Sequence, residues 1–190
     1  MRFIGLGVAA VLALSSPAHA AWQTYTFSDQ GFSIESPVPL AKGTGVYRGA
    51  VAGRLDTITY TGALDGISYK VSVIDISKRI PDAVNIFLEM EFLTPFGAKV
   101  IGNDSVGIEP GSGRHYGRQL VYVTKDGNQV RTTLIYNKGK IYTCEAIVPA
   151  NGDKDSILPE RFADSILFDL DGAARERDAD PKNFTTPDGK

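Results

Sequence analysis

The chain has 190 residues, of which 43% are hydrophobic and 22% are charged, and its formal net charge is −2. This composition is typical of a globular, strand-rich protein whose size suits one domain, and the acidic balance argues against a nucleic-acid partner. A single cysteine excludes an intramolecular disulfide, so stability has to come from packing.

The first twenty residues have the three parts of a secretory signal peptide. Arg2 supplies the positive start, residues 4–14 form an apolar run broken only by glycines, and residues 18–20 (Ala-His-Ala) form a small-x-small cleavage site. The apolar run of about eleven residues is too short for a membrane span, which needs roughly 20. We expect cleavage between Ala20 and Ala21 and a mature periplasmic protein that does not span the membrane. No cysteine stands at the cleavage site, so no lipid anchor is expected.

The predicted domain covers residues 21–170. Strands are expected at 22–27 and 32–35, on either side of a turn at Gly31, and a Pro/Gly-rich loop follows up to Gly45. Strands 54–61 and 67–76 then form a hairpin, for which Asp65-Gly66 is the turn signal.

A helix is predicted after Pro81-Asp82 and ends before Thr94-Pro95. Its main apolar stripe has helical spacing and consists of Ala83, Ile86, Phe87, Met90 and Leu93. A second apolar row lies on another side of the same helix and consists of Val84, Leu88 and Phe92. A helix that is apolar on two sides is either wedged beneath another segment or presents a surface to a partner. Burial under the N-terminal strands or the Pro-rich loop is the favoured interpretation, and a partner-binding surface is the alternative.

The second half of the domain is predicted to form an antiparallel meander with strands at 99–108, 114–124, 129–136 and 140–148. With a two-residue turn at Asp126-Gly127 and a three-residue loop at 137–139, Arg131 lies opposite Tyr122, and Cys144 lies opposite Thr132. A second helix is expected over residues 155–168. The polar residues 171–190 are expected to form a disordered tail. This order of elements predicts an α+β fold in which helices cover a mostly antiparallel sheet.

Four short motifs of this chain resemble the Mog1/PsbP-like superfamily. They lie at residues 32–37 (FSIESP), 117–118 (GR), 139–142 (GKIY) and 161–166 (RFADSI). The resemblance implies an α/β/α sandwich that serves as a non-enzymatic binding or assembly module. It implies no catalytic residue and no cofactor.

The sequence contains no recognisable catalytic or metal-binding motif. After signal cleavage, His115 and Cys144 are the only histidine and cysteine, and the register above places them roughly 20 Å apart, which is too far for a catalytic dyad. Cys144 is expected to be a buried core residue. No Gly-x-Ser-x-Gly motif is present, and one histidine with one cysteine cannot form a tetrahedral zinc site. We therefore expect no catalytic residue and no metal.

Basic residues are concentrated between Gly111 and Lys140, where only Asp126 is acidic. One sheet face is predicted to combine arginine with tyrosine through Arg114, Tyr116, Arg118, Tyr122 and Arg131. Such a face could hold an anionic ligand or a glycan through bidentate and cation-π contacts. The alternative is that these charges are solvated or paired with a helix.

The leading prediction is an exported, non-enzymatic module that binds a protein of the cell envelope. The first alternative is a binder of an anionic ligand or glycan that uses the Arg/Tyr face. The second alternative is a hydrolase whose catalytic residues form no recognisable motif.

Overall fold

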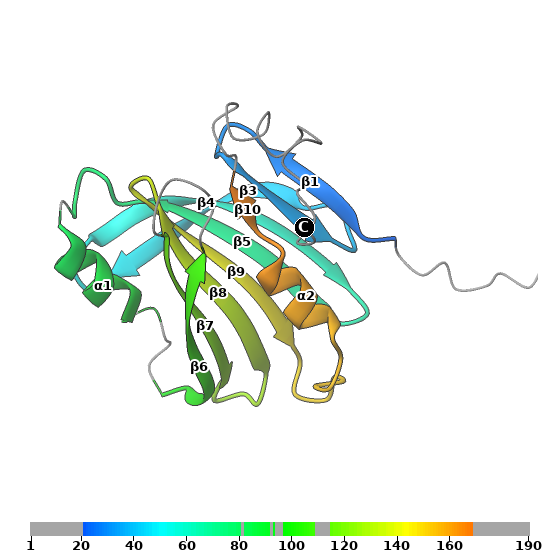
Figure 1. The fold of residues 1–190 in the computed structure, drawn as a ribbon. Helices are drawn as coiled ribbons and strands as arrows, with labels where there is room; N and C mark the ends of the chain where they lie inside the picture. The colour runs from blue at the N-terminus through cyan, green and yellow to red at the C-terminus, as the bar shows by residue number, and fades with distance from the viewer. Residues whose placement is uncertain (1–20, 81, 92, 94–96, 109–114, 169–190) are drawn as a thin grey trace, which may run out of the picture.

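The computed structural model describes residues 21–80, 82–91, 93, 97–108 and 115–168 (Figure 1). Two helices are found in these ranges, Ala83–Glu91 (α1) and Leu158–Asp164 (α2). The strands of the first half are Gln23–Phe27 (β1), Phe32–Ser36 (β2), Ala41–Gly49 (β3), Gly53–Leu64 (β4) and Ile67–Asp75 (β5). Those of the second half are Lys99–Ile108 (β6), His115–Val123 (β7), Gln129–Asn137 (β8), Lys140–Val148 (β9) and Leu167–Phe168 (β10).

A seven-stranded antiparallel sheet dominates the fold. Its strand order is β3-β4-β5-β9-β8-β7-β6. Consecutive hairpins build each half, and the pairing of β5 with β9 joins the two halves. A smaller sheet has the order β1-β2-β10. The predicted sheet-dominated α+β fold is therefore confirmed.

Both faces of the large sheet carry apolar cores because side chains alternate along each strand. On one face, Phe162 of α2 and Phe32 of the small sheet pack against a cluster that includes Tyr142 and Cys144 of β9. Figure 1 shows α2 lying across β8 and β9. On the other face, Met90 of α1 belongs to a second cluster with residues of β5, β7, β8 and β9.

The second part of the segment predicted as a Pro/Gly-rich loop, from Ala41 onward, is in fact strand β3, whereas residues 37–40 lie outside the strands. It pairs with β4 from Ala41 to Gly49. Its glycines lower the intrinsic strand preference, but pairing along a long neighbouring strand outweighs that local preference. The sequence-based prediction of a loop at this position was therefore wrong.

The predicted meander register is wrong by one residue. Asn137 pairs with Lys140, so the loop has only two residues, Lys138 and Gly139, with φ of 47° and 82°, typical of a type I′ turn. Cys144 consequently lies opposite Thr133.

The pairing of β7 with β8 is shifted in the same way. Arg131 lies opposite Val121, because Tyr122 pairs with Val130. A shift of one residue moves a side chain to the other face of the sheet, so Arg131 and Tyr122 do not share a face.

The second predicted helix is shorter than expected. Helix α2 ends at Asp164, and Leu167 and Phe168 pair with β2 as strand β10. Several predictions lie outside the described residues: the signal peptide with Ala20, the tail 171–190, Phe92 and Arg114. None of the helices described has the length and apolar character needed to cross a bilayer.

Candidate functional site

Helix α1 is fastened to the sheet by the buried side chain of Glu89. The Glu89 carboxylate has no exposed surface and accepts hydrogen bonds from the backbone N–H groups of Val51 at 2.6 Å and Ala52 at 3.0 Å. The Tyr47 hydroxyl donates a third hydrogen bond to it, and burial together with this contact raises the pKa of Tyr47. Helix α1 is thereby joined to the turn between β3 and β4.

Gly49 leaves the space that the Glu89 carboxylate occupies. A Cβ atom at position 49 would overlap the Glu89 carboxylate oxygen. The absence of a side chain at this strand end is therefore a condition for the buried contact.

Arg118 of β7 holds the other end of α1. Its guanidinium is buried and donates to the Met90 carbonyl oxygen at 3.2 Å, and it forms an ion pair with Glu91 at 3.2 Å. A further N–H donates to Asn103 Oδ1 at 3.1 Å. A cation at the C-terminal end of a helix also interacts favourably with the helix dipole.

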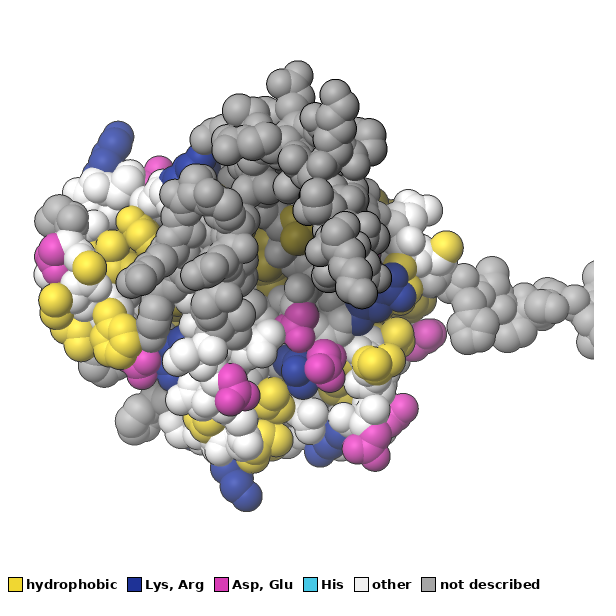
Figure 2. Space-filling view, in the orientation of Figure 1, with side chains coloured by type: hydrophobic (Ala, Val, Ile, Leu, Met, Phe, Trp, Pro, Cys, Tyr) yellow, Lys and Arg dark blue, Asp and Glu magenta, His cyan; other side chains and the backbone are white. Residues whose placement is uncertain are grey.

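The outward side of α1 exposes three apolar side chains. Val84, Phe87 and Leu88 are 70%, 45% and 39% exposed, and their spacing places them on one helix face. Val51, in the neighbouring turn, is also exposed. Figure 2 shows hydrophobic side chains gathered over α1. We call Val84, Phe87 and Leu88 the α1 surface.

The apolar stripe predicted for α1 is only partly correct. Met90 is fully buried, and Ile86 and Leu93 pack against the same cluster, but Phe87 belongs to the exposed side. The buried position that the pattern did not reveal is Glu89, because a charged residue carries no apolar signal. Two residues of the predicted second row, Val84 and Leu88, are exposed.

The predicted Arg/Tyr face is not formed as expected. Arg118 and Tyr122 are buried on the α1 side of the sheet, whereas Arg131 lies on the α2 side, 3.1 Å from Glu160 and 3.9 Å from Asp164. Tyr116 lies on β7, where its backbone pairs with Tyr136. Arg118 is paired with Glu91 of α1 and Arg131 with Glu160 and Asp164 of α2, so these two arginines follow the helix-paired alternative that the sequence left open.

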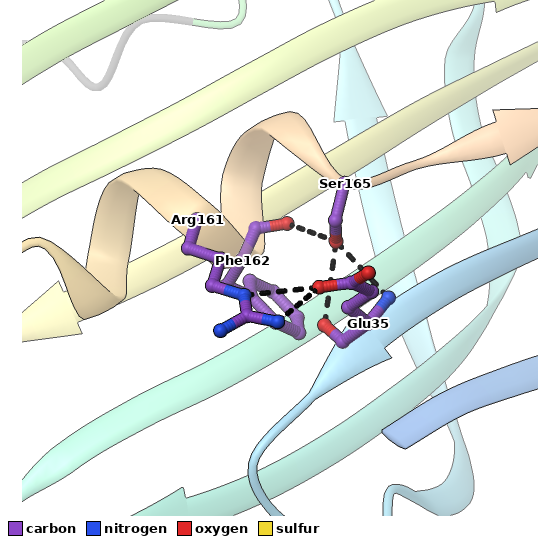
Figure 3. A network of polar contacts seen from close by, with 4 residues as sticks. All are labelled: Glu35, Arg161, Phe162 and Ser165. Atoms are coloured by element: carbon purple, nitrogen blue, oxygen red, sulfur yellow. Dashed lines mark hydrogen bonds and ion pairs between the residues drawn. The ribbon is translucent and has the colours of Figure 1, made fainter. Parts of the chain in front are cut away.

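A polar network fixes α2 to the small sheet (Figure 3). Arg161 donates to the Glu35 carboxylate through Nε at 3.0 Å and through Nη2 at 2.8 Å. The Ser165 hydroxyl accepts from the Glu35 backbone N–H at 3.0 Å and lies 2.9 Å from the Phe162 carbonyl oxygen. These contacts join the end of α2 to β2.

A hollow of about 370 Å³ lies on the same side of the sheet as α1. Side chains of β4, β5 and β9 form its polar floor, and these are Thr57, Thr59, Lys70, Ser72, Thr143 and Glu145. Tyr47, Ile74 and Leu93 add apolar contacts. This hollow was not predicted from the sequence, although the alternating hydroxyl residues of β4 were a visible signal.

His115 and Cys144 lie apart in the structure. Cys144 has no exposed surface, as predicted, and burial raises the pKa of its thiol. It pairs with Thr133, which pairs with Gln119, four residues along β7 from His115. That offset is about 13 Å along the strand, with two strand spacings added across the sheet. Within the described ranges, no group of three potential metal ligands is found.

Comparison with known proteins found a similarity in structure but none in sequence. No family model matches the chain, and no curated protein matches it. The structure is similar to the solution structure of cyanobacterial PsbP (CyanoP) from Synechocystis sp. PCC 6803, with a TM-score of 0.49 and 15% sequence identity. The match covers 86% of this chain and 99% of that chain. This likeness concerns the fold alone.

Proposed function

We propose that this chain is a non-enzymatic binding module that captures a partner protein through the α1 surface. The observation that carries the proposal is the exposure of Val84, Phe87 and Leu88 on a helix whose opposite side is firmly attached to the sheet. An apolar patch on a rigid element gains free energy when a partner covers it, and the partner does not have to order the helix first.

The proposal places the protein in the periplasm with an envelope protein as its partner. The signal-peptide pattern of residues 1–20 supports export, with cleavage between Ala20 and Ala21. The arrangement of α1 and α2 on opposite sides of the sheet supports the finer assignment, an α/β/α sandwich of the Mog1/PsbP-like type. In this proposal the domain extends over residues 21–170.

The partner should be identified by crosslinking in cells. A photo-crosslinking amino acid at position 88 should yield a discrete adduct, whereas the same group at Ile157, which is 70% exposed beside α2, should not. Leu88→Asp should then abolish the adduct formed from position 84, because a carboxylate cannot enter an apolar interface without a partner.

Two controls decide between a surface role and a core role for the α1 surface. Ile157→Asp is the matched variant and should leave the adduct from position 84 unchanged. The melting temperature of Leu88→Asp should stay near that of the wild type. An unfolded Leu88→Asp variant would show that the row is core, and equal adducts from positions 88 and 157 would show that α1 has no specific partner.

A further inference from the structure

The hollow beside α1 contains an unusual set of hydroxyl groups. Thr59 pairs with Ser72, and Ser72 pairs with Thr143, so three hydroxyl residues stand side by side across β4, β5 and β9. Neighbouring side chains in such a row are about 5 Å apart. Thr57 stands two residues before Thr59 on the same face of β4.

These hydroxyl groups have no protein partner. Within the described part of the chain, none of Thr57, Thr59, Ser72 and Thr143 makes a side-chain hydrogen bond, although three of them are only 7% exposed. Their oxygen atoms are not among the fully buried polar atoms that lack a partner, so they are open to the hollow, and each hydroxyl offers one donor and two acceptor positions. The hollow therefore presents a row of unused donors and acceptors.

The charges in the hollow balance each other. Lys70 Nζ lies 3.0 Å from Glu145 Oε2 on the wall of the hollow. A matched ion pair adds no net charge that would select an anion. Carboxylate oxygens and ammonium hydrogens of this kind are able to form strong, charge-assisted hydrogen bonds with the hydroxyl groups of a neutral ligand.

The remaining wall is apolar and fixed in place. Tyr47 contributes its ring, and its hydroxyl is tied to Glu89, so the ring is held. Ile74 and Leu93 extend this apolar wall. A ligand that suits the hollow has hydroxyl groups on one side and C–H groups on the other.

Glycines of β3 keep the hollow open. Gly43 pairs with Thr59, and Gly45 pairs with Thr57. A Cβ atom at position 45 would lie 3.0 Å from Thr57 Oγ1 and one at position 43 would lie 3.1 Å from Thr59 Oγ1. Side chains at either position would crowd the hydroxyl groups that line the floor.

We propose that this hollow is a binding site for a neutral polyhydroxyl ligand, namely one sugar unit. The row of unpartnered hydroxyls would bind the sugar hydroxyls, the Lys70–Glu145 pair would bind two of them by charge-assisted hydrogen bonds, and Tyr47 would cover the C–H side. The volume lies at the lower end of the range for small-ligand sites, about 300–1,000 Å³, which fits a single sugar unit. This site does not depend on the proposed protein partner of α1.

The direct test is an NMR titration of the mature protein with glucose, N-acetylglucosamine, maltotetraose and chitotetraose. Saturable shifts should occur in the backbone amides of β4, β5 and β9, with a dissociation constant of about 1 mM or tighter. Tighter binding of a tetrasaccharide than of its monomer would identify a glycan as the source, and equal binding would identify a free sugar. Glucose 6-phosphate, which is anionic, should bind no better than glucose.

Variants locate the site. Thr59→Val and Thr143→Val keep the side-chain shape and remove the hydroxyl, and together they should weaken binding at least about tenfold. Thr24→Val, on the exposed strand β1, is the matched control and should bind like the wild type. Gly45→Val fills the hollow without removing any hydroxyl and should also weaken binding.

The proposal is overturned by three results. These are the absence of saturable shifts with all four sugars, preference for glucose 6-phosphate, and unchanged affinity in folded Thr59→Val/Thr143→Val protein. If that double variant does not fold, the Gly45→Val result decides, and unchanged affinity there would equally exclude the hollow.

Discussion

At the scale of single residues, the carboxylate of Glu89 is the most demanding contact in the molecule. Three donors converge on two oxygen atoms in a place without solvent. An amide at this position would direct its NH₂ group toward at least one N–H or O–H donor, and that donor would lose its acceptor.

We therefore expect Glu89→Gln to lower the free energy of unfolding by about 2 kcal/mol, the range for hydrogen bonds to charged groups. Urea denaturation measures the change. Glu160→Gln is the control, because Glu160 forms a half-exposed ion pair with Arg131 and should contribute below about 1 kcal/mol. Equal stability of Glu89→Gln and wild type would show that this buried contact does not hold α1.

The burial of Cys144 could be predicted from the sequence, and that of Arg118 could not. Alternation along one strand is a local pattern, and it correctly predicted that Cys144 is buried. Arg118 is buried because the Met90 carbonyl and the Glu91 carboxylate meet it from a distant helix. No local pattern predicts that meeting, so the sequence suggested an accessible arginine.

At the scale of elements, helix α2 depends on Ser165 more than on Arg161. The Ser165 hydroxyl satisfies the backbone N–H of Glu35 in β2 and lies beside the last carbonyl groups of the helix. Arg161 contacts the Glu35 carboxylate at a half-exposed position, where water and salt screen the attraction.

Ser165→Ala should therefore destabilise the protein by about 1 kcal/mol, and Arg161→Ala by less. Thermal unfolding at low and high salt distinguishes the two contributions. The effect of Arg161→Ala should shrink as salt rises, and that of Ser165→Ala should not. The reverse ranking would mean that the ion pair, rather than the hydroxyl, joins α2 to the small sheet.

The periodicity of the sequence predicted the positions of helices and strands along the chain more reliably than it predicted which strand residues pair. Most strands and the start of α1 lie where alternation and turn signals predicted them. The predicted register between β8 and β9 placed Asn137 in the turn, whereas the structure places it in the strand. This difference alone changes the residue opposite Cys144 from Thr132 to Thr133. Strand β3 was missed because its glycines are tolerated only in contact with β4.

At the scale of the whole molecule, buried tyrosines limit stability at alkaline pH. Burial raises the pKa of Tyr69 and of Tyr142 to about 12, from the ordinary value of 10.0. The folded state favours the neutral phenol, so this contribution is complete below pH 10 and is lost as the pH rises through 12.

Cooperative unfolding and tyrosinate absorbance should consequently rise together in this range. The hydroxyl of Tyr69 has no hydrogen-bond partner among the residues that the structure describes, so Tyr69→Phe should preserve stability at neutral pH and move the alkaline transition upward. The measurement is circular dichroism against pH, followed together with absorbance. Full ionisation near pH 10 without loss of structure would contradict the assignment.

The sheet-dominated α+β class could be anticipated from the sequence, because many local patterns agree on the same architecture. The hollow could not, because it exists only where β3, β4, β5 and β9 lie next to one another and bring Gly45, Ser72 and Glu145 together. Sites of this kind depend on pairing between segments that are distant in the chain.

The close approach of Gly49 and Glu89 restricts which residues can stand at these two positions in homologous chains. Any ancestor that gained a side chain at position 49 would have had to lose the acid at position 89, and the turn between β3 and β4 would then have needed another acceptor. Among homologues, the two positions should change together: glycine should accompany glutamate, and a larger residue should accompany a short or apolar one. The residue pair at positions 49 and 89 would therefore identify homologues in which α1 is attached in the same way, even where overall sequence identity is low.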